Sequence, residues 1–462
     1  MTESYQDFIE RKSQLQGMDG LKAKWIPSVM FDFQAFLTEW ALLRARAAIF
    51  LDCGLGKTLM EFVWAQNVAE ETNKPVLISC PLAVSYQMLK EANKFGIELH
   101  RSSDGKAHKP ITVTNYQRLH LFNEAEFSGM VCDESGILKG YDGATRKIIT
   151  NFMRKMKYRL LATATPAPND YIELGNSSEA LGYLGSPEML VRFFKNEQNN
   201  SDQKSKWAGK GGGTPKWRFK GHAEEHFWRW VCSWARAGRK PSDVGQFSDE
   251  KFILPGLIQR DWIVEPRSLP EGKLFQVPAF SLYEQREERR RTIRERCEKV
   301  AELVSEKSQR PAAVWCHLNP EGDLLEKMIP DCIQVKGADS DDEKEEKLMA
   351  FTNLQADCIV SKSQIAGWGL NWQHCWHQTH FPTHSFEQWF QSVRRSLRFG
   401  QTRKVLLDLI STEGEKIVMD NLKSKAVAAD RMFDRIVALM SKELKINRRE
   451  QFDEAEMIPA WM

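Results

Sequence analysis

The sequence predicts an α/β protein with two tandem lobes, each a parallel β-sheet flanked by helices, plus an insertion and C-terminal helices. Two observations carry this prediction. From Phe31, short apolar runs alternate with helical stretches, and the same alternation resumes at Ala312 after a long charged segment. The apolar runs of the first lobe also end at polar clusters, and a parallel sheet places its chemistry outside the carboxyl ends of its strands.

The composition fits a protein of this class. The chain has 462 residues, of which 42% are hydrophobic and 27% charged, which suffices for two large lobes with additions. No stretch approaches the roughly 20 uninterrupted apolar residues of a membrane span. The N-terminus lacks the basic-then-apolar pattern of a secretion signal, and nine cysteines occur singly, as in proteins whose thiols stay reduced. We therefore expect a cytoplasmic protein without membrane contact.

The charge balance excludes a global field that would recruit nucleic acid. The chain has 65 Lys and Arg residues against 62 Asp and Glu residues, a net charge of +3. Any contact with nucleic acid must therefore come from local basic patches.

These patterns divide the chain into six expected segments. They are an N-terminal lead-in (1–28), a first lobe (29–190), an insertion with a helix (191–255), a connector with a charged helix (256–310), a second lobe (311–412) and C-terminal helices (413–462).

Short apolar runs mark the expected strands, and longer periodic stretches mark the helices. The strand candidates are Ala47–Leu51, Val76–Ser79, Ile111–Thr114, Met130–Cys132, Tyr158–Ala162, Ala312–Cys316, Ile333–Val335, Cys358–Val360 and Val405–Ile410. The helix candidates include Val84–Phe95, the charged run Tyr283–Lys307, and one or two closing helices within Gly414–Ile446.

The insertion is expected to contain a polar loop at Lys195–Lys220, because its Asn, Gln, Gly and Lys residues cannot bury much surface. Trp207, Trp217 and Phe219 alternate there with basic residues. Two interpretations remain open: base stacking on a nucleic acid, or a solvated insertion. The aromatic residues from Phe227 to Trp234 that follow have helical spacing, which indicates a core-facing helix.

The strongest local motif is a glycine-punctuated turn between a strand and a helix, Leu51-Asp52-Cys53-Gly54-Leu55-Gly56-Lys57-Thr58. Its two glycines allow backbone N–H groups to close around an anion, and the following helix directs its positive end at the same point. In a phosphate loop (Walker A motif, P-loop), Lys57 would reach the β- and γ-phosphates and the Thr58 hydroxyl would bind Mg²⁺. Leu51 stands where the strict pattern has glycine, and an ordinary turn with a surface lysine is the alternative.

Two further polar clusters follow apolar strands. Asp133 and Glu134 come directly after Met130–Cys132. Asp133 would hold Mg²⁺ and Glu134 would orient and deprotonate the attacking water. Thr163-Ala164-Thr165-Pro166 follows the next strand, and its hydroxyls would hydrogen-bond the acidic pair. Taken singly, these segments would be a solvated turn and a Thr-Pro turn.

The order of the motifs resembles helicase superfamily 2 over Phe31 to Ile410. It looks most like the Swi/Snf-type (DEAD/DEAH-box-like) branch, particularly compact phage- and prophage-encoded members. The matching segments are Gly54–Thr58, Asp133-Glu134-Ser135-Gly136, Thr163-Ala164-Thr165-Pro166, Ala366–Asn371 and Gln391–Gln401, with weaker matches at Gln34, Cys80-Pro81-Leu82, Thr114-Asn115-Tyr116, Trp315–Leu318 and Gly337–Ser340.

The resemblance implies two RecA-like lobes that face each other across ATP and Mg²⁺, and it assigns roles to residues. It implies catalytic roles for Lys57, Glu134, Arg395 and Arg398, nucleotide contacts for Gln34, Gly54, Leu55, Gly56, Lys57, Thr58 and Gln391, Mg²⁺ ligands at Thr58 and Asp133, and nucleic-acid contacts at Pro81, Thr114, Tyr116, Gly367 and Asn371.

Arg395 and Arg398 are three residues apart, so on a helix they would share a face. Each could then reach the γ-phosphate, where a planar cation stabilises the charge that spreads over the equatorial oxygens. The neighbouring Arg394, Arg403 and Lys404 are also consistent with a simple basic surface helix.

Two departures from the family pattern concern the coupling of ATP hydrolysis to movement and not the hydrolysis itself. Ser135-Gly136 replaces the Ala-His of many relatives, and Arg394 stands where they carry glycine. Neither change removes a catalytic group.

A competing site for a metal ion involves His374, Cys375, His377, His380 and His384. Their spacing matches no common zinc pattern, and the nearby tryptophans favour a packed loop.

The sequence thus leads us to expect an ATP-dependent nucleic-acid motor, most closely a double-stranded DNA translocase that hydrolyses ATP to ADP and phosphate. The alternatives are a strand-separating DNA or RNA helicase and a nucleic-acid-binding scaffold with a vestigial ATPase. The residues that argue against the scaffold are intact Lys57, Asp133, Glu134, Arg395 and Arg398. We further expect a monomer in a bacterial or phage-infected cytosol, with phage replication or recombination proteins as possible partners.

Overall fold

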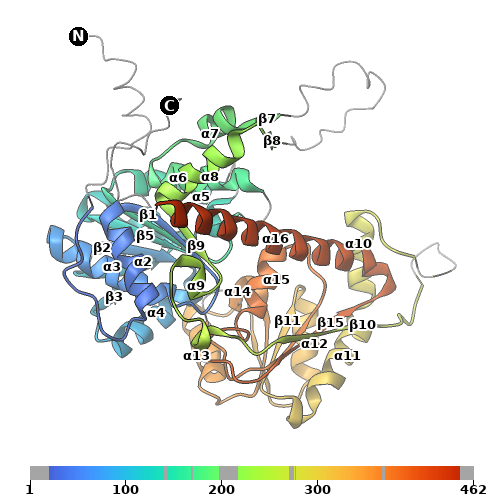
Figure 1. Ribbon diagram of the computed structural model, residues 1–462. Helices are drawn as coiled ribbons and strands as arrows, with labels where there is room; N and C mark the ends of the chain where they lie inside the picture. The colour runs from blue at the N-terminus through green and yellow to red at the C-terminus, as the bar shows by residue number, and fades with distance from the viewer. Residues whose placement is uncertain are drawn as a thin grey trace, which may run out of the picture. The chain divides into compact units, whose positions relative to one another are not determined.

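The computed structural model describes residues 20–139, 143–167, 170–196, 217–269, 275, 277–366 and 370–447 (Figure 1). Most of the lead-in, the centre of the insertion at 197–216, and Gly367 lie outside the described residues. The chain forms two compact units. The first contains Glu91–Asp249 with the described residues up to Cys80 and from Arg431 onward, and the second contains Pro81–Lys90 and Glu250–Asp430.

A seven-stranded sheet forms the centre of the first unit. Its strand order is β3-β4-β2-β5-β6-β1-β9, and neighbouring strands run parallel throughout, as the sequence predicts. The strands are β1 (Arg46–Leu51), β2 (Val76–Cys80), β3 (Leu99–Arg101), β4 (Ile111–Asn115), β5 (Gly129–Asp133), β6 (Tyr158–Thr163) and β9 (Ala235–Gly238). Successive residues of the central strands are buried, which means that both faces of the sheet are covered.

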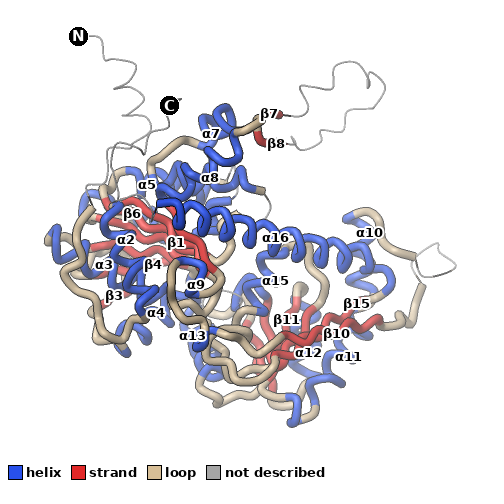
Figure 2. Tube along the Cα trace, in the orientation of Figure 1, coloured by secondary structure: helices blue, strands red, loops and turns tan. Residues whose placement is uncertain are grey.

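Helices cover this sheet, and Figure 2 shows them in blue beside the red strands. They are α2 (Asp32–Arg44), α3 (Lys57–Thr72), α5 (Ala144–Arg154), α6 (Leu174–Leu181), α7 (Ser186–Phe193), α8 (Ala223–Trp234) and α9 (Pro241–Val244). Helix α4 (Leu82–Lys94) follows β2, and its residues up to Lys90 belong to the second unit. The aromatic residues of α8 face the core, as their helical spacing predicts. Trp234, for example, is fully buried and meets Phe50 of β1 edge to face, with ring centroids 6.3 Å apart.

The described ends of the insertion form a small antiparallel sheet of β7 (Phe194–Asn196) and β8 (Trp217–Phe219). Phe219 stacks on Phe194 with ring centroids 4.5 Å apart, and Trp217 packs against the same core. These two aromatic side chains therefore pack against the core of the first unit, which neither interpretation of the insertion predicted. Trp207 lies outside the described residues.

The second unit also contains one parallel sheet, with the strand order β10-β15-β14-β11-β13-β12. Its strands are β10 (Leu257–Ile263), β11 (Ala312–Cys316), β12 (Cys332–Val335), β13 (Cys358–Lys362), β14 (His377–His380) and β15 (Val405–Ser411). Edge strand β10 lies in the segment for which the sequence predicts a connector. Its attachment is polar: Asp408 of β15 accepts hydrogen bonds from Arg260 Nε at 2.7 Å and from Trp262 Nε1 at 2.8 Å.

The second unit's helices are α10 (Leu282–Arg291), α11 (Ile293–Ser305), α12 (Asn319–Met328), α13 (Asp341–Thr352), α14 (Ser363–Ala366), α15 (Phe386–Val393) and the first part of α16 (Lys416–Asn447). The predicted charged helix is therefore two helices, which meet at the buried Thr292. In the described part of the chain, no helix is both long enough and apolar enough to cross a membrane.

Candidate active site

Three of the predicted motifs meet at the carboxyl edge of the first sheet. Strands β5, β6 and β1 are neighbours, with Asp133 beside Ala162 and Thr163 beside Phe50. The acidic pair, the Thr-Ala-Thr-Pro segment and the phosphate loop therefore leave adjacent strands at the same edge. This confirms the prediction that the polar clusters at the strand ends gather at one place.

The phosphate loop has the backbone conformation that its glycines allow. Gly54 and Gly56 have φ angles of +91° and +77°, in the left-handed region that residues with a Cβ rarely adopt. Helix α3 begins at Lys57, directly after Gly56. Its first N–H groups have no partner within the helix and its dipole is positive at this end, so the loop offers a binding site for a phosphate anion.

Gln34 of α2 holds this loop from one side. Its Nε2 donates a hydrogen bond to Leu55 O at 2.9 Å, and its Oε1 accepts one from Phe31 N at 3.0 Å. Gln34 is only 4% exposed. A Cβ on Gly56 would lie 2.2 Å from Gln34 Nε2, so a larger residue would displace the Gln34 side chain from its hydrogen bond with Leu55 O.

Gly56→Ala should therefore distort the loop. We expect ATP affinity to fall by about tenfold or more, since a forced left-handed residue costs roughly 1–2 kcal/mol and the clash displaces Gln34. Titration with a fluorescent ATP analogue measures the affinity. Gly96→Ala is the matched control, because Gly96 has a φ of +67° and open space around its Cβ position. It should lower stability while leaving ATP affinity unchanged, and intact ATP affinity in Gly56→Ala would contradict the assignment of the loop.

Lys57 is held against its own loop. Its Nζ donates to Leu51 O at 2.9 Å and to Asp52 O at 3.4 Å. Both acceptors are neutral carbonyl groups, so a phosphate oxygen would be a stronger partner for this ammonium group. The carbonyl groups of the loop thus hold the Lys57 ammonium group where an anionic ligand could bind to it.

The acidic pair lies in an environment that disfavours negative charge. Burial, and then the adjacent Glu134, raise the pKa of Asp133 to about 7, against the lowering effect of Lys57. Glu61, one turn after Lys57 on α3, is fully buried, and burial and Asp133 raise its pKa well above the ordinary value. A divalent cation held by Asp133 and Thr58 would favour the ionised form of the Asp133 carboxyl group.

Glu61 is a residue whose place at the site sequence reasoning missed. The available signal was a single acidic residue in an otherwise apolar stretch of α3, four residues after Lys57. Burial of a carboxyl group in such a stretch needs a nearby partner or a raised pKa.

Glu134 follows β5 in a strained turn, with a φ angle of +53°. Its backbone N–H donates to Asp133 Oδ1 at 2.9 Å, and its Oε2 lies 3.5 Å from Thr163 Oγ1, which donates to it. Thr163 Oγ1 in turn accepts from Thr165 N at 3.1 Å. The Thr-Ala-Thr-Pro segment therefore contacts the acidic pair, as the sequence predicts.

Two residues for which the resemblance implies nucleic-acid contacts face the interior instead. Tyr116 is 5% exposed, packs in the core and donates its hydroxyl to the carbonyl oxygen of Asp133. Thr114 on β4 is also buried, at 1% exposed, whereas Pro81 after β2 is half-buried. Tyr116 therefore holds the backbone of Asp133 from within the core, and its ring is not presented at the surface.

Helix α15 ends at Val393, within the arginine motif. Arg395 and Arg398 therefore lie in turns and not on a helix, contrary to the expectation from their spacing. They converge nevertheless, because Arg395 Nη1 and Arg398 Nη1 donate to the same carbonyl oxygen, Leu370 O, at 2.9 and 3.1 Å. Arg395 is 2% exposed and Arg398 is half-buried.

Gln391 fixes the position of Arg395. It is fully buried, and its side-chain Oε1 accepts from Arg395 Nη2 at 3.1 Å. Asn371, which directly follows Leu370, is half-buried, and Gly367 lies outside the described residues. The structure thus joins Gln391, Arg395 and Arg398 to the segment that ends in Asn371.

The histidine-rich segment does not form a metal site. Nε2 of His377 lies 2.8 Å from Asp408 Oδ2, and Nε2 of His380 lies 3.2 Å from Gln378 Oε1. Within the ranges that the structure describes, no three His, Cys, Asp or Glu side chains are placed to hold a metal ion. The packed-loop interpretation of this segment is the one that the contacts support.

Part of the chain, including the motifs of this site, is similar in sequence to known helicases. Residues 14–168, about a third of the chain, match the family described as "Type III restriction enzyme, res subunit", a helicase domain of superfamily 2. The chain is also similar to the "DNA annealing helicase and endonuclease ZRANB3" of Mus musculus and of Bos taurus, with 28% and 29% identity over 182 residues. The match covers 35% of this chain and only 16% of each relative. The region with the helicase-domain match includes the phosphate loop, the acidic pair and the Thr-Ala-Thr-Pro segment.

Proposed function

We propose that this protein is a nucleic-acid-dependent ATPase that works as a motor on double-stranded DNA. The observation that carries the proposal is the meeting of Lys57, Asp133 and Glu134 at one sheet edge, below a loop with the conformation of an anion site. A second parallel-sheet unit with a paired arginine motif and the helicase-domain match support it.

Each residue at this edge has a defined task in the proposed reaction. The phosphate loop and Lys57 bind the β- and γ-phosphates, and Gln34 holds the loop in shape. Glu134 orients a water molecule and accepts its proton as the water oxygen bonds to the γ-phosphorus and the bond to the ADP oxygen breaks. A Mg²⁺ ion held by Thr58 and Asp133 supplies charge neutralisation on the phosphates when bound. We assign Arg395 and Arg398 to stabilisation of the charge that develops on the γ-phosphate.

The translocase assignment rests on the resemblance of the motif order to Swi/Snf-type proteins. A motor needs a nucleotide that binds one of its two conformational states more tightly than the other. Hydrolysis then removes this preference for one state. A strand-separating helicase remains the second candidate, since residues 14–168 match a helicase domain of superfamily 2.

Steady-state ATP hydrolysis tests the proposal. We expect slow turnover without nucleic acid, strong stimulation by duplex DNA, weaker stimulation by single-stranded DNA and RNA, and loss of all turnover in Lys57→Ala. Equally low hydrolysis rates under every condition would contradict the motor function and favour a nucleic-acid-binding scaffold. Preference for single strands, followed by strand displacement on a forked duplex, would instead identify a helicase.

A further inference from the structure

Edge strand β10 differs from every other strand of the two parallel sheets, because five of its seven residues are exposed (Figure 2). No residue of the other strands in these two sheets is exposed. The exposed residues of β10 include three large apolar ones, Leu257, Ile258 and Ile263, which are 37%, 45% and 66% exposed. An exposed apolar strand at the edge of a sheet is a template on which another strand can pair.

The other edge strands of the two sheets are shorter. Strands β3, β9 and β12 have three, four and four residues, and a short edge is one means by which proteins prevent unwanted pairing. Strand β10 contains no proline or lysine, and it pairs with β15 from Leu257 to Ile263 without a bulge. It therefore lacks three further devices that commonly protect an edge.

The hydrogen bonds at the two ends of β10 show which of its backbone groups face outward. Gly256 O accepts from Val405 N at 3.1 Å, and Val264 N donates to Ser411 O at 2.8 Å. In a parallel pair, alternate residues of a strand direct their N–H and C=O groups to the same neighbour, so the even-numbered residues bond β15. The residues that direct these groups to the other edge are Leu257, Gln259, Asp261 and Ile263. In the described part of the chain, β15 is the only strand that pairs with β10.

The two charged side chains of β10 are compensated within the second unit. Arg260 donates two hydrogen bonds to Asp408, from Nε and from Nη2, both at 2.7 Å. Asp261 accepts from Gln259 Nε2 at 3.0 Å and from Lys423 Nζ of α16 at 2.5 Å. Neither charge therefore depends on solvent alone at the edge, and an approaching strand meets ion pairs instead of single charges.

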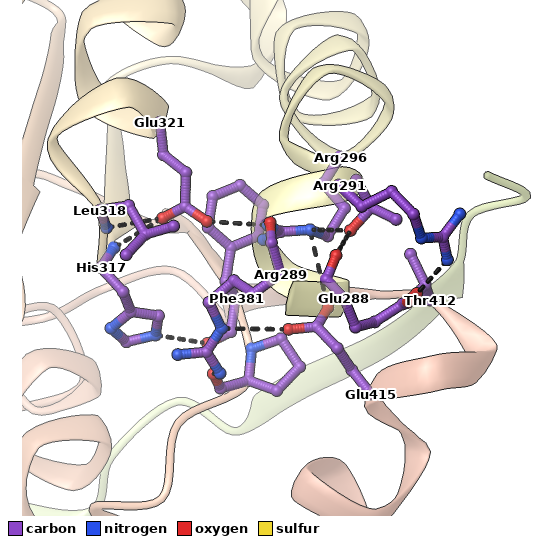
Figure 3. Close-up of polar contacts among 12 residues, drawn as sticks. Glu288, Arg289, Arg291, Arg296, His317, Leu318, Glu321, Phe381, Thr412 and Glu415 are labelled. Carbon is purple, nitrogen blue, oxygen red and sulfur yellow. Dashed lines mark hydrogen bonds and ion pairs between the residues drawn. The ribbon is translucent and has the colours of Figure 1, made fainter. Parts of the chain in front are cut away.

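The strand that carries β10 is fixed at its carboxyl end beside a buried ionic network (Figure 3). Thr412 directly follows β15, and its Oγ1 donates to Glu288 Oε1 at 2.7 Å. Arg296 of α11 is fully buried and pairs with Glu321 at 2.9 Å and with Glu415 at 3.6 Å. Strands β15 and β10 thus form a rigid edge, and a rigid surface loses little freedom when it binds a partner.

The sequence of β10 is complementary to itself when it is read in the opposite direction from Arg260. The first residue on each side of Arg260 is polar, and the second and third residues on each side are apolar. If two β10 strands pair in antiparallel orientation with Arg260 at the centre, apolar residues lie opposite apolar residues. Gln259 of each strand then lies opposite Asp261 of the other, where an amide can donate to a carboxylate.

Other registers fit less well. A pair centred on Asp261 would place two carboxylates opposite each other, and a pair centred on Gln259 would place Leu257 opposite Asp261. The backbone favours the same centre as the side chains do. With Arg260 at the centre, the four outward-facing residues of one strand lie opposite those of the other and exchange N–H and C=O hydrogen bonds in pairs.

We propose that the free edge of β10 is a dimer interface, at which it pairs with β10 of a second copy of this chain. The two strands run antiparallel with a two-fold axis at Arg260, so the sheets of the two second units continue into each other. The proposal goes beyond the proposed function, since it uses no residue of the candidate active site. It differs from the sequence-based expectation of a monomer.

Sedimentation velocity of the full chain over a range of concentrations tests this interface. We expect a monomer–dimer equilibrium with a dissociation constant of roughly 1–100 µM, because one strand pair buries less surface than the ~1,600 Å² of a standard interface. Ile263→Lys places a charge opposite Leu257, and Gln259→Pro removes an outward N–H group. Each should raise the dissociation constant about tenfold or more and leave thermal unfolding unchanged. Leu354→Lys is the matched control, since Leu354 is a 62% exposed leucine of the second unit outside β10.

Cysteine cross-linking tests the register. Residues that lie opposite each other in a hydrogen-bonded antiparallel pair have Cα atoms about 5.5 Å apart, which a disulfide can span. A mixture of Leu257→Cys and Ile263→Cys chains should therefore form more covalent dimer on oxidation than either variant alone or the wild type.

Three results would overturn the proposal. The first is a wild-type chain that stays monomeric up to about 100 µM. The second is a dimer whose dissociation constant is unchanged in Ile263→Lys and Gln259→Pro, which would place the contact on another surface. The third is an equal yield of covalent dimer from the mixture and from the single cysteine variants, which would exclude the register centred on Arg260.

Discussion

Glu134→Gln is expected to lower the rate of ATP hydrolysis by about 10³-fold while ATP affinity stays within a few-fold of the wild type. A positioned general base contributes roughly 10²–10⁴-fold, and the amide keeps the size of the side chain but cannot accept the proton of the attacking water. The turn geometry should survive, because the backbone N–H of residue 134 can still donate to Asp133 Oδ1. The phosphate loop, Lys57 and Thr58 are also unchanged in this variant.

Phosphate release under saturating ATP and duplex DNA measures the rate, and a fluorescent ATP analogue measures the affinity. Glu126→Gln is a suitable control, because Glu126 is an exposed acidic residue of the same unit. A Glu134→Gln enzyme that retained more than a tenth of wild-type turnover would show that the proton goes elsewhere. Loss of nucleotide binding would instead assign Glu134 to binding.

Arg296→Met is expected to destabilise the second unit by about 3–5 kcal/mol, the usual cost of removing one member of a buried ion pair. Arg296 is fully buried between Glu321 and Glu415, which are 0% and 1% exposed, and its guanidinium group lies 4.5 Å from the ring centroid of Phe381. Methionine fills much of the volume but leaves Glu321 without its cation and Glu415 with Arg289 as its remaining ion-pair partner. Chemical denaturation followed by circular dichroism measures the loss.

Arg294→Met on the same helix provides the comparison. Arg294 is 70% exposed and pairs with Glu298 at the surface, so its loss should cost at most about 0.5 kcal/mol. Equal effects of the two substitutions would mean that the buried network contributes nothing beyond a surface pair.

The Arg296→Met deficit should also depend on pH. Burial raises the pKa of Glu321, but Arg296 and His317 outweigh burial and leave it below its ordinary value. In the wild type, Glu321 therefore adds stability above its unfolded pKa of about 4.3, and this is lost as pH falls through the lower folded value. Without Arg296 the folded pKa rises, the folded state binds the extra proton, and the stability deficit shrinks as pH falls from 7 toward 5.

Much of the fold was predictable because its signals are local. Each apolar run of β2, β4, β5, β6, β11 and β13 is short, buried on both faces and followed by a polar residue or turn, which is how a parallel strand reads in sequence. The gathering of Asp133, Thr163 and the phosphate loop followed from one topological rule about strand ends. The conformations of Gly54 and Gly56 followed from glycine chemistry.

The remaining features depend on partners that are distant in the chain. Edge strand β10 has exposed and polar residues, and its pairing depends on Asp408, about 150 residues later. Nothing in the local sequence shows that Tyr116 points inward. The apolar stretch around Glu61 indicates that this side chain is buried, but it does not identify Asp133 as the neighbour. The free edge of β10 likewise depends on which of its backbone groups bond β15, so it becomes visible only in three dimensions.

At Glu134, a backbone conformation that lowers stability coincides with the side chain to which we assign proton transfer. A φ of +53° is unfavourable for any residue with a Cβ, by roughly 1–2 kcal/mol, and it arises because β5 ends and the short helix Ser135–Lys139 begins with no residue to spare. Glycine would relax this turn at no steric cost. Glu134→Gly is therefore expected to raise the melting temperature of the first unit while it removes the carboxylate to which we assign proton transfer.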